Sequence, residues 1–264
     1  MESPDFELSD QRSRIIPNLI HLLDILDERK ATATFFVLGW VARKFPEVLA
    51  LIDTRGHEVA SHGYSHGDIT SMPREKLVDE LRRSREIIED IIKKPAYGYK
   101  AAGEYRVKLD PEILRLAAES GYRYFFGPSI RAKSIRPNEP TTAAIDGGKS
   151  IIIVPFSVIK KFGLSARFSE KSRVYPAWFI QRAIAGLNRR GQSAVINLKL
   201  WELDHNHRRP PGAAYTDFTS YGNLRLTEEK LKRLLDIFEF RSFYENLELT
   251  TGTKTDPFAE TDKL

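Results

Sequence analysis

The segment RGHEVASHGYSH, residues 55–66, holds three of the six histidines of the chain. His62 and His66 are four residues apart, and two imidazoles at this spacing can face one metal ion if they share a side of a helical turn. Close histidine pairs also occur in turns where they make only local hydrogen bonds, so spacing alone leaves both interpretations open. His57 lies within the segment HEVAS, and we expect it to be a half-buried histidine at a strand edge.

The elements that position these histidines alternate along the chain between amphipathic segments and short apolar ones. The predicted helices cover residues 15–30, 41–56, 72–94, 110–121, 177–190 and 226–238. The predicted strands are ATATFFVLG, HEVAS, AYGYKAA, YRYFFG, SIIIVPFSV, SAVINLKLWEL and SFYENLEL. Thr227 is expected to cap the last helix, and residues 127–149 are expected to be irregular.

This alternation favours a parallel sheet covered by helices. We predict one domain over residues 1–250, closed or nearly closed into a (β/α) barrel, and a C-terminal tail over residues 251–264. In such barrels the chemistry lies at the C-terminal ends of the strands, and His62 and His66 follow the strand HEVAS directly.

Composition narrows the possible partners and ligands. The net charge of +5 is mild, and lysine and arginine are interspersed with acidic residues, which fits an anionic glycan better than nucleic acid. The absence of cysteine leaves histidine and carboxylate as the ligands for any metal. The N-terminal residues MESPDFELSDQRSR have no apolar core, and the longest apolar run is too short for a membrane span, so we expect a cytoplasmic protein.

The segment KATATFFVLGWVARKFPEVLALIDTRGHEVASHGYSH resembles the core of the polysaccharide deacetylase family, also called the NodB-homology fold. The segments ELRRSREIIEDI, GYKAAGEY, GYRYFFGPSI, VPFSV and INLKLWELD follow in the order found in that family. The closing segment and the last predicted helix are most similar to the subgroup found with bacterial exopolysaccharide loci.

The resemblance implies a distorted (β/α) barrel that binds a divalent metal, usually zinc, through one Asp and two His. His62 and His66 would be the two histidines. The family removes N-acetyl groups from a polysaccharide or sugar: a metal-activated water attacks the carbonyl, an Asp acts as base and a late His as acid.

Several family positions differ in this chain. The first apolar strand with its Asp pair is not evident; Asp5, Glu7 and Asp10 are the nearby acids. Lys100 stands where the family has an arginine and loses the planar fork that holds a carboxylate at two points. Lys199 stands where the family has its late histidine; a desolvated lysine near a metal could serve as the acid in its place, and the alternative is that the acid is lost.

Candidate substrate contacts surround these positions. Trp201 and Tyr64 could stack on sugar rings, although aromatic residues pack into cores equally often, and Glu202 lies beside Trp201 in the sequence. His205 and His207 are two residues apart in a polar loop, where we expect them to be solvated.

Three hypotheses follow. The chain is a metal-dependent N-deacetylase, which a preceding segment with the Asp pair would complete. Alternatively, it is a non-catalytic homologue that keeps the barrel to bind a glycan or a protein. The third is a hydrolase acting on another amide, with Lys100 and Lys199 binding an acidic substrate. The sequence does not predict an oligomeric state.

Overall fold

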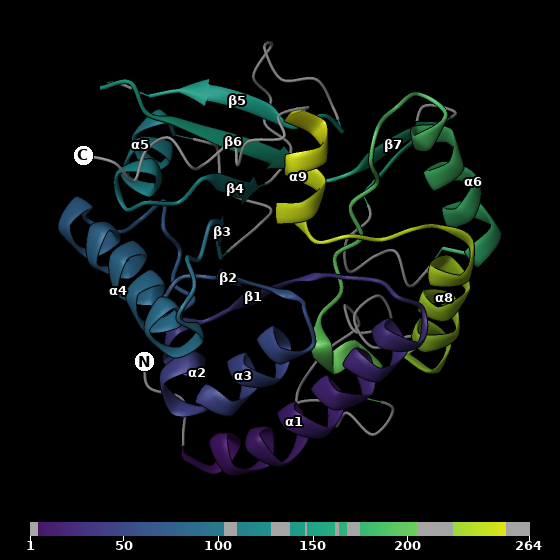
Figure 1. Ribbon diagram of the computed structural model, residues 1–264, viewed down its shortest axis with the longest axis horizontal. Coiled ribbons are helices and arrows are strands. Elements are labelled where there is room, and N and C mark those ends of the chain that lie inside the picture. Colours follow the sequence, from purple (N-terminus) through teal and green to yellow (C-terminus); the bar gives the residue numbers. More distant parts are fainter. Residues whose placement is uncertain are drawn as a thin grey trace. The chain divides into compact units, whose positions relative to one another are not determined.

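The computed structural model describes residues 5–102, 110–127, 138–145, 147–161, 164–167, 175–204 and 224–251. The chain forms two compact units (Figure 1). Unit 1 comprises Met1–Ala31 and Ser157–Glu239, and unit 2 comprises Thr32–Phe156 and Phe240–Leu264. The single domain over residues 1–250 stays a prediction, and the predicted tail from residue 252 onward lies outside the described residues.

Unit 2 is built on a six-stranded sheet with the order β1-β2-β3-β4-β6-β5. Its strands are β1 (Thr34–Val37), β2 (Glu58–Ser61), β3 (Gly98–Lys100), β4 (Tyr124–Gly127), β5 (Thr141–Ala144) and β6 (Ser150–Pro155). Neighbouring strands are parallel, except that β5 runs antiparallel to β6. Its helices are α2 (Gly39–Lys44), α3 (Pro46–Thr54), α4 (Arg74–Ile92), α5 (Pro111–Glu119) and α9 (Phe243–Thr251). The predicted α/β architecture is confirmed. The described strands form an open sheet, with β1 and β5 at its edges, and do not close into a barrel.

The two faces of this sheet have different partners, because successive side chains of a strand point to opposite sides. Tyr99 and Phe125 belong to a core that includes Leu77 and Leu81 of α4 and the apolar side of α5. Figure 1 shows these two helices beside the sheet. Phe126, one residue after Phe125, packs instead against Phe243 of α9.

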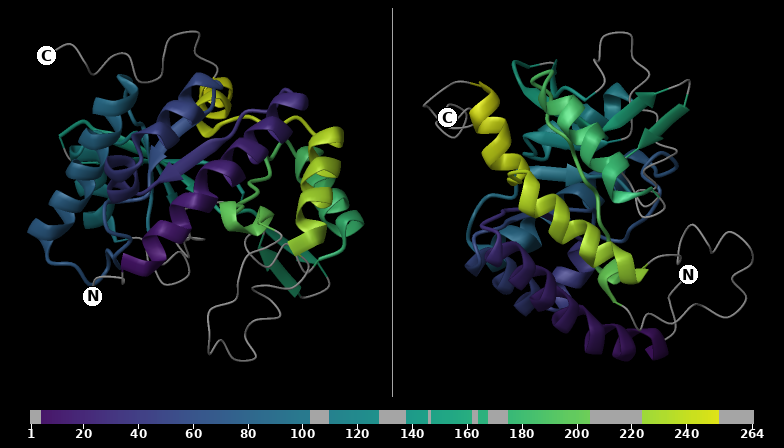
Figure 2. Two further views of the ribbon diagram at one scale, coloured as in Figure 1. Left: turned by 90° about the horizontal axis from the view of Figure 1, so that it is seen from below. Right: turned by 90° about the vertical axis from the view of Figure 1, so that its right-hand side faces the viewer.

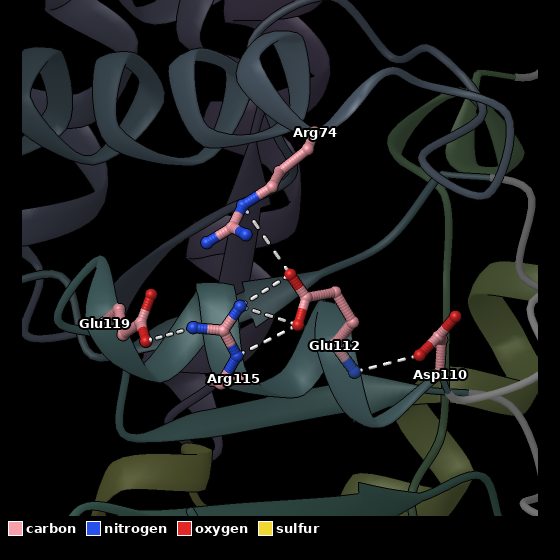
Figure 3. Close-up of polar contacts among 5 residues, drawn as sticks. All are labelled: Arg74, Asp110, Glu112, Arg115 and Glu119. Atoms are coloured by element: carbon pink, nitrogen blue, oxygen red, sulfur yellow. Dashed lines mark hydrogen bonds and ion pairs between the residues drawn. The ribbon is translucent and has the colours of Figure 1, made fainter. Parts of the chain in front are cut away.

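Helix α5 begins where the sequence predicts. The side chain of Asp110 accepts a hydrogen bond from the backbone N–H of Glu112, and Pro111 occupies the first turn. Arg115 then binds both oxygens of Glu112 and one oxygen of Glu119, while Arg74 approaches Glu112 from α4 (Figure 3). These contacts lie near the surface and fix the helix start rather than a site.

A polar cluster fastens the start of α9 to the N-terminal ends of β1, β2 and β4. The carboxylate of Glu58 accepts hydrogen bonds from the hydroxyl of Thr34, from the hydroxyl of Tyr124 at 2.7 Å and from the backbone N–H of Tyr244 at 3.0 Å. Burial raises the pKa of Glu58 and holds that of Tyr124 well above its ordinary value.

Unit 1 contains α1 (Asp5–Glu28), β7 (Val158–Lys161), β8 (Leu164–Arg167), α6 (Ala177–Asn188), the 3-10 helix η2 (Leu200–Leu203) and α8 (Leu224–Ile237), and Figure 2 shows its helices from two further sides. Four leucines of α1, within the range predicted as a helix, are buried: Leu19, Leu22, Leu23 and Leu26. The strands β7 and β8 form an antiparallel hairpin. None of the helices described for the chain is both long and apolar enough to cross a bilayer.

Two predicted strands are wrong. The segment 242–249 is the start of α9, because Ser242 and Glu245 form a capping box: each accepts a hydrogen bond from the backbone N–H of the other. The segment 193–203 forms no strand and ends in η2. Its β-branched composition suits a strand, but a strand also needs a partner to pair with.

Smaller differences concern helix and strand limits. The helix predicted over residues 41–56 is two helices. Phe45 has a non-helical backbone between them, and Pro46 is the first residue of the second helix. Helix α8 begins three residues before Thr227, so Thr227 is a buried helical residue rather than a cap. The segment 127–149, expected to be irregular, contains β5.

Candidate metal centre

His62 and His66 meet at the C-terminal end of β2. Their ring centroids lie 4.9 Å apart and the rings are almost perpendicular, at 87°. The connecting residues form no helix, so the pair does not meet by way of the helical turn considered from spacing. It meets through a turn in which Gly63 has a φ of 81° and His66 a φ of 62°, both in the left-handed region. That backbone is uncommon for residues with a side chain, although histidine adopts it more often than most, and such outliers are frequent at functional sites.

His62 is held by the strands on both sides of β2. Its backbone N–H donates to the carbonyl of Val37 in β1 at 2.9 Å. Its Nδ1 lies 2.8 Å from the backbone carbonyl of Lys100 in β3. Because a carbonyl oxygen only accepts, Nδ1 carries the proton and Nε2 presents its lone pair. This arrangement fixes the tautomer and orientation that metal-binding histidines generally have.

Helix α2 supports the same turn from another direction. The backbone N–H groups of Gly39 and Trp40 donate to the carbonyls of Gly63 at 2.8 Å and Tyr64 at 3.3 Å. Gly39 cannot be larger without displacing its neighbours, since a Cβ there would lie 2.9 Å from the Tyr64 ring and 3.0 Å from the backbone of Ser84. The turn is therefore closely packed from the side of α2.

Lys100 is buried on β3 and extends toward aromatic rings. Its Nζ lies 5.7 Å from the ring centroids of both Phe36 and Phe126, which stack on each other with an interplanar angle of 16°. Cation–π attraction to two faces stabilises an ammonium group in this apolar setting. Lys100 thus contributes a backbone acceptor to His62 and a positive charge on the α9 side of the sheet.

The predicted substrate-binding residues fall in different parts of the chain. Tyr64 is half-buried, and the guanidinium carbon of Arg83 lies 3.9 Å from its ring centroid, which covers one face of the ring. Lys199, Trp201 and Glu202 belong to unit 1, at η2, and their predicted roles stay predictions. The structure does not describe His205 and His207.

The acids considered near the N-terminus lie in α1, and only their backbone is described: Asp5, Glu7 and Asp10. His57 is buried, and its Nδ1 accepts from the backbone N–H of Ala33 at 3.3 Å. It packs against Phe35 rather than joining the histidine pair. His57 was expected to be half-buried, which is wrong, since it is buried. Its contacts are those of a residue that packs in the fold.

Two residues beneath the turn escaped sequence reasoning. Glu80 and Ser84 are buried among the apolar residues of α4, on the side that also carries Leu77, Leu81 and Ile88. Polar residues at core-facing positions of an amphipathic helix break the binary pattern, and such breaks mark functional or strained sites. The presence of Glu80 and Ser84 among the apolar positions of this helix was the sequence signal that could have identified them.

The histidine pair supplies part of a metal site. Two imidazoles, one with its Nε2 oriented by Lys100, suit two ligand positions of a zinc-type centre. Among the described residues, no group of three or more His, Cys, Asp or Glu could hold a metal ion. The described part of the chain therefore fits a metal through two ligands and leaves the third position to another donor.

The described part of the chain is thus an α/β fold with a histidine pair that follows one of its parallel strands. Residues 17–125 match the model of the polysaccharide deacetylase family, and residues 130–248 match a domain of unknown function, DUF3473. The N-terminal half of the chain is therefore similar to the polysaccharide deacetylase family.

Individual proteins show the same similarity. The chain is 28% identical over 102 residues to a peptidoglycan-N-acetylglucosamine deacetylase of Bacillus cereus, an alignment covering 39% of this chain and 46% of that protein. A protein of Mycobacterium smegmatis assigned as a polysaccharide deacetylase has a solved structure with a TM-score of 0.67, at 18% identity, over 92% of this chain and 80% of the other.

A CE4-family pseudoenzyme from Bacillus anthracis has a TM-score of 0.51 at 12% identity, covering 87% of this chain and 60% of the other. The two structural matches show the fold alone. The chain spans less than half the length of the curated relatives that it matches.

Proposed function

We propose that this chain is a metal-dependent deacetylase that removes N-acetyl groups from a bacterial polysaccharide, with an exopolysaccharide as the substrate class. One observation carries the proposal. His62 and His66 meet with their rings 4.9 Å apart, at the end of a parallel strand, inside the segment that matches the deacetylase family.

His62 and His66 would hold the divalent metal, which we propose to be zinc. Such an ion, when bound, lowers the pKa of water and polarises a carbonyl group. The chain's own contribution is orientation: the carbonyl of Lys100 keeps the proton of His62 on Nδ1 and leaves Nε2 for the ligand.

Lys100 stands at the family's arginine position and keeps its positive charge. Because an ammonium is a point charge, it would hold a carboxylate at a single point and with less angular control than the guanidinium fork. In this proposal Lys199 replaces the late acid and Trp201, near it in unit 1, contacts the sugar, while Tyr64 of unit 2 is a separate candidate contact. Glu202 is buried, and its contact with the sugar stays a prediction from the sequence. We also propose the cytoplasm as its location.

The test combines metal content with acetate release from an N-acetylglucosamine oligomer. We expect about one equivalent of zinc or cobalt in the purified chain, and its loss together with activity in His62→Ala and His66→Ala. The matched control is His21→Ala, which removes a half-exposed imidazole that pairs with Glu228 in unit 1. A chain that binds no metal and releases no acetate would contradict the proposal.

A second candidate is a non-catalytic homologue that binds a glycan or a partner protein. It is favoured by the incomplete ligand set of the described residues and by lysine at two family positions. The fold does not decide between them, since a pseudoenzyme shares it. Glycan binding without acetate release, unchanged in His62→Ala, would support this candidate.

A further inference from the structure

Helix α4 holds both ends of the turn that carries the histidine pair. Oε1 of Glu80 accepts a hydrogen bond from the backbone N–H of Ser65 at 2.6 Å, and the Ser65 hydroxyl donates to the same carboxylate at 3.1 Å. One helical turn further on, the hydroxyl of Ser84 lies 2.9 Å from that of Ser61. Ser61 in turn accepts from the backbone N–H of Gly63 at 3.1 Å.

Because Glu80 is buried, its carboxylate depends on the hydrogen bonds from Ser65. Glu80 is 5% exposed, and a buried carboxylate is costly unless donors satisfy it. Ser65 supplies two such donors, one of them charge-assisted and short. A carboxylate kept at a core position by a turn residue indicates that the turn, rather than the core, requires it.

The turn packs closely against Glu80 at Gly63. A Cβ on Gly63 would lie 3.1 Å from Oε1 of Glu80 and 3.5 Å from the hydroxyl of Tyr99, which is completely buried. Gly63 is therefore pressed against this pair of polar groups. The residue that Glu80 binds, Ser65, directly precedes His66, whose φ of 62° is unfavourable for a residue with a side chain.

We propose that Glu80 is a positioning residue for the metal centre, holding Ser65 so that His66 keeps its left-handed backbone and faces His62. The inference rests on the proposed function, and it adds a residue that contacts neither metal nor substrate. Ser84 and Ser61 hold the entry to the turn, Glu80 holds the exit, and the two histidines lie between these anchors.

The main variant is Glu80→Gln, which keeps the size of the side chain but removes the charge that receives both donors of Ser65. The matched control is Glu86→Gln on the same helix, where the exposed carboxylate pairs with Arg82 at the surface. Cobalt(II) titration followed by absorbance reports the affinity of the pair. We expect affinity to fall about 10- to 100-fold in Glu80→Gln, as for other residues that orient metal ligands, and to stay unchanged in Glu86→Gln.

Amide hydrogen exchange of residues 63–66, measured without metal, is the second readout. We expect faster exchange in Glu80→Gln at these residues and unchanged exchange in α5. Should wild type bind no cobalt, the proposed function fails, whereas faster exchange confined to the turn still supports Glu80 as its anchor. Ser65→Ala, a change of an exposed residue, serves if Glu80→Gln does not fold, with a smaller loss of affinity expected.

Two results would overturn the proposal. The first is wild-type cobalt affinity together with wild-type exchange of the turn in Glu80→Gln. The second is a uniform increase of exchange across the turn and α5, because that pattern is general destabilisation and not loss of positioning.

Discussion

Gly98 is the position where a single methyl group should have the largest effect on the sheet of unit 2. A Cβ placed on Gly98 would lie 2.7 Å from Cε2 of Tyr124, and closer still to its Cζ and hydroxyl oxygen. The Tyr124 ring cannot move aside easily, because it is completely buried and packs against Phe36 and Phe243. Its hydroxyl also donates to Glu58 at 2.7 Å.

Two terms set the expected cost of Gly98→Ala. Overpacking of a filled core costs about 1–3 kcal/mol. Displacing Tyr124 also breaks a hydrogen bond to a carboxyl group, worth about 1.5–3 kcal/mol if the carboxyl is charged. We therefore expect a loss of roughly 3–6 kcal/mol in the free energy of unfolding, a large part of the roughly 5–15 kcal/mol that stabilises an ordinary domain.

Urea denaturation followed by circular dichroism measures this loss. The matched control is Gly186→Ala in the last turn of α6, where the new Cβ would lie 3.9 Å from the side chain of Arg189. The same substitution there should stabilise the helix by at most about 0.5–1 kcal/mol, the value for the middle of a helix. The double variant Gly98→Ala with Tyr124→Leu should be less destabilised than the sum of the two single changes. A cost below about 1 kcal/mol for Gly98→Ala, or strict additivity in the double variant, would refute the steric reasoning.

Three further predictions concern protonation and capping. The raised pKa of Glu58 means that its contribution to stability is present below the usual carboxyl pKa and is lost as the pH rises through the folded-state pKa, so Glu58→Gln should flatten this decline in urea midpoints measured from pH 4 to 8. Ser242→Ala removes the N-cap of α9 and should cost about 1 kcal/mol in urea denaturation, while Ser242→Thr should cost less. Lys232 and His21 lower the pKa of Glu228 to about 2, so the stabilisation from Glu228 is lost only as the pH falls toward that value; NMR titration should show the pKa rising in Lys232→Met.

The sequence predicted the location of the histidine pair better than its geometry. The order of strand, helix and strand before His62 predicted a position at a C-terminal strand end, and that is where the structure has it. The spacing suggested a helical turn, whereas a left-handed residue brings the rings together. Backbone of this kind depends on tertiary contacts with α2 and α4, which spacing does not encode.

The prediction failed where pairing or capping decides between similar patterns. Residues 242–249 alternate enough to suggest a strand, but the capping box at Ser242 and Glu245 starts a helix. Residues 193–203 have strand composition without a strand partner in the described chain. Glu80 was missed for a related reason, since only its neighbours in space explain a carboxylate in an apolar stripe.

His62 joins three neighbouring strands: it belongs to the turn after β2, its backbone N–H binds β1, and its imidazole binds the backbone of β3. The side chain therefore has a structural task that is independent of any ligand. A protein of this fold without any catalytic activity would still lose these contacts if His62 were replaced. Conservation of His62 among homologues would therefore be weak evidence that they use the site for catalysis. Conservation of the exposed His66 would be stronger evidence.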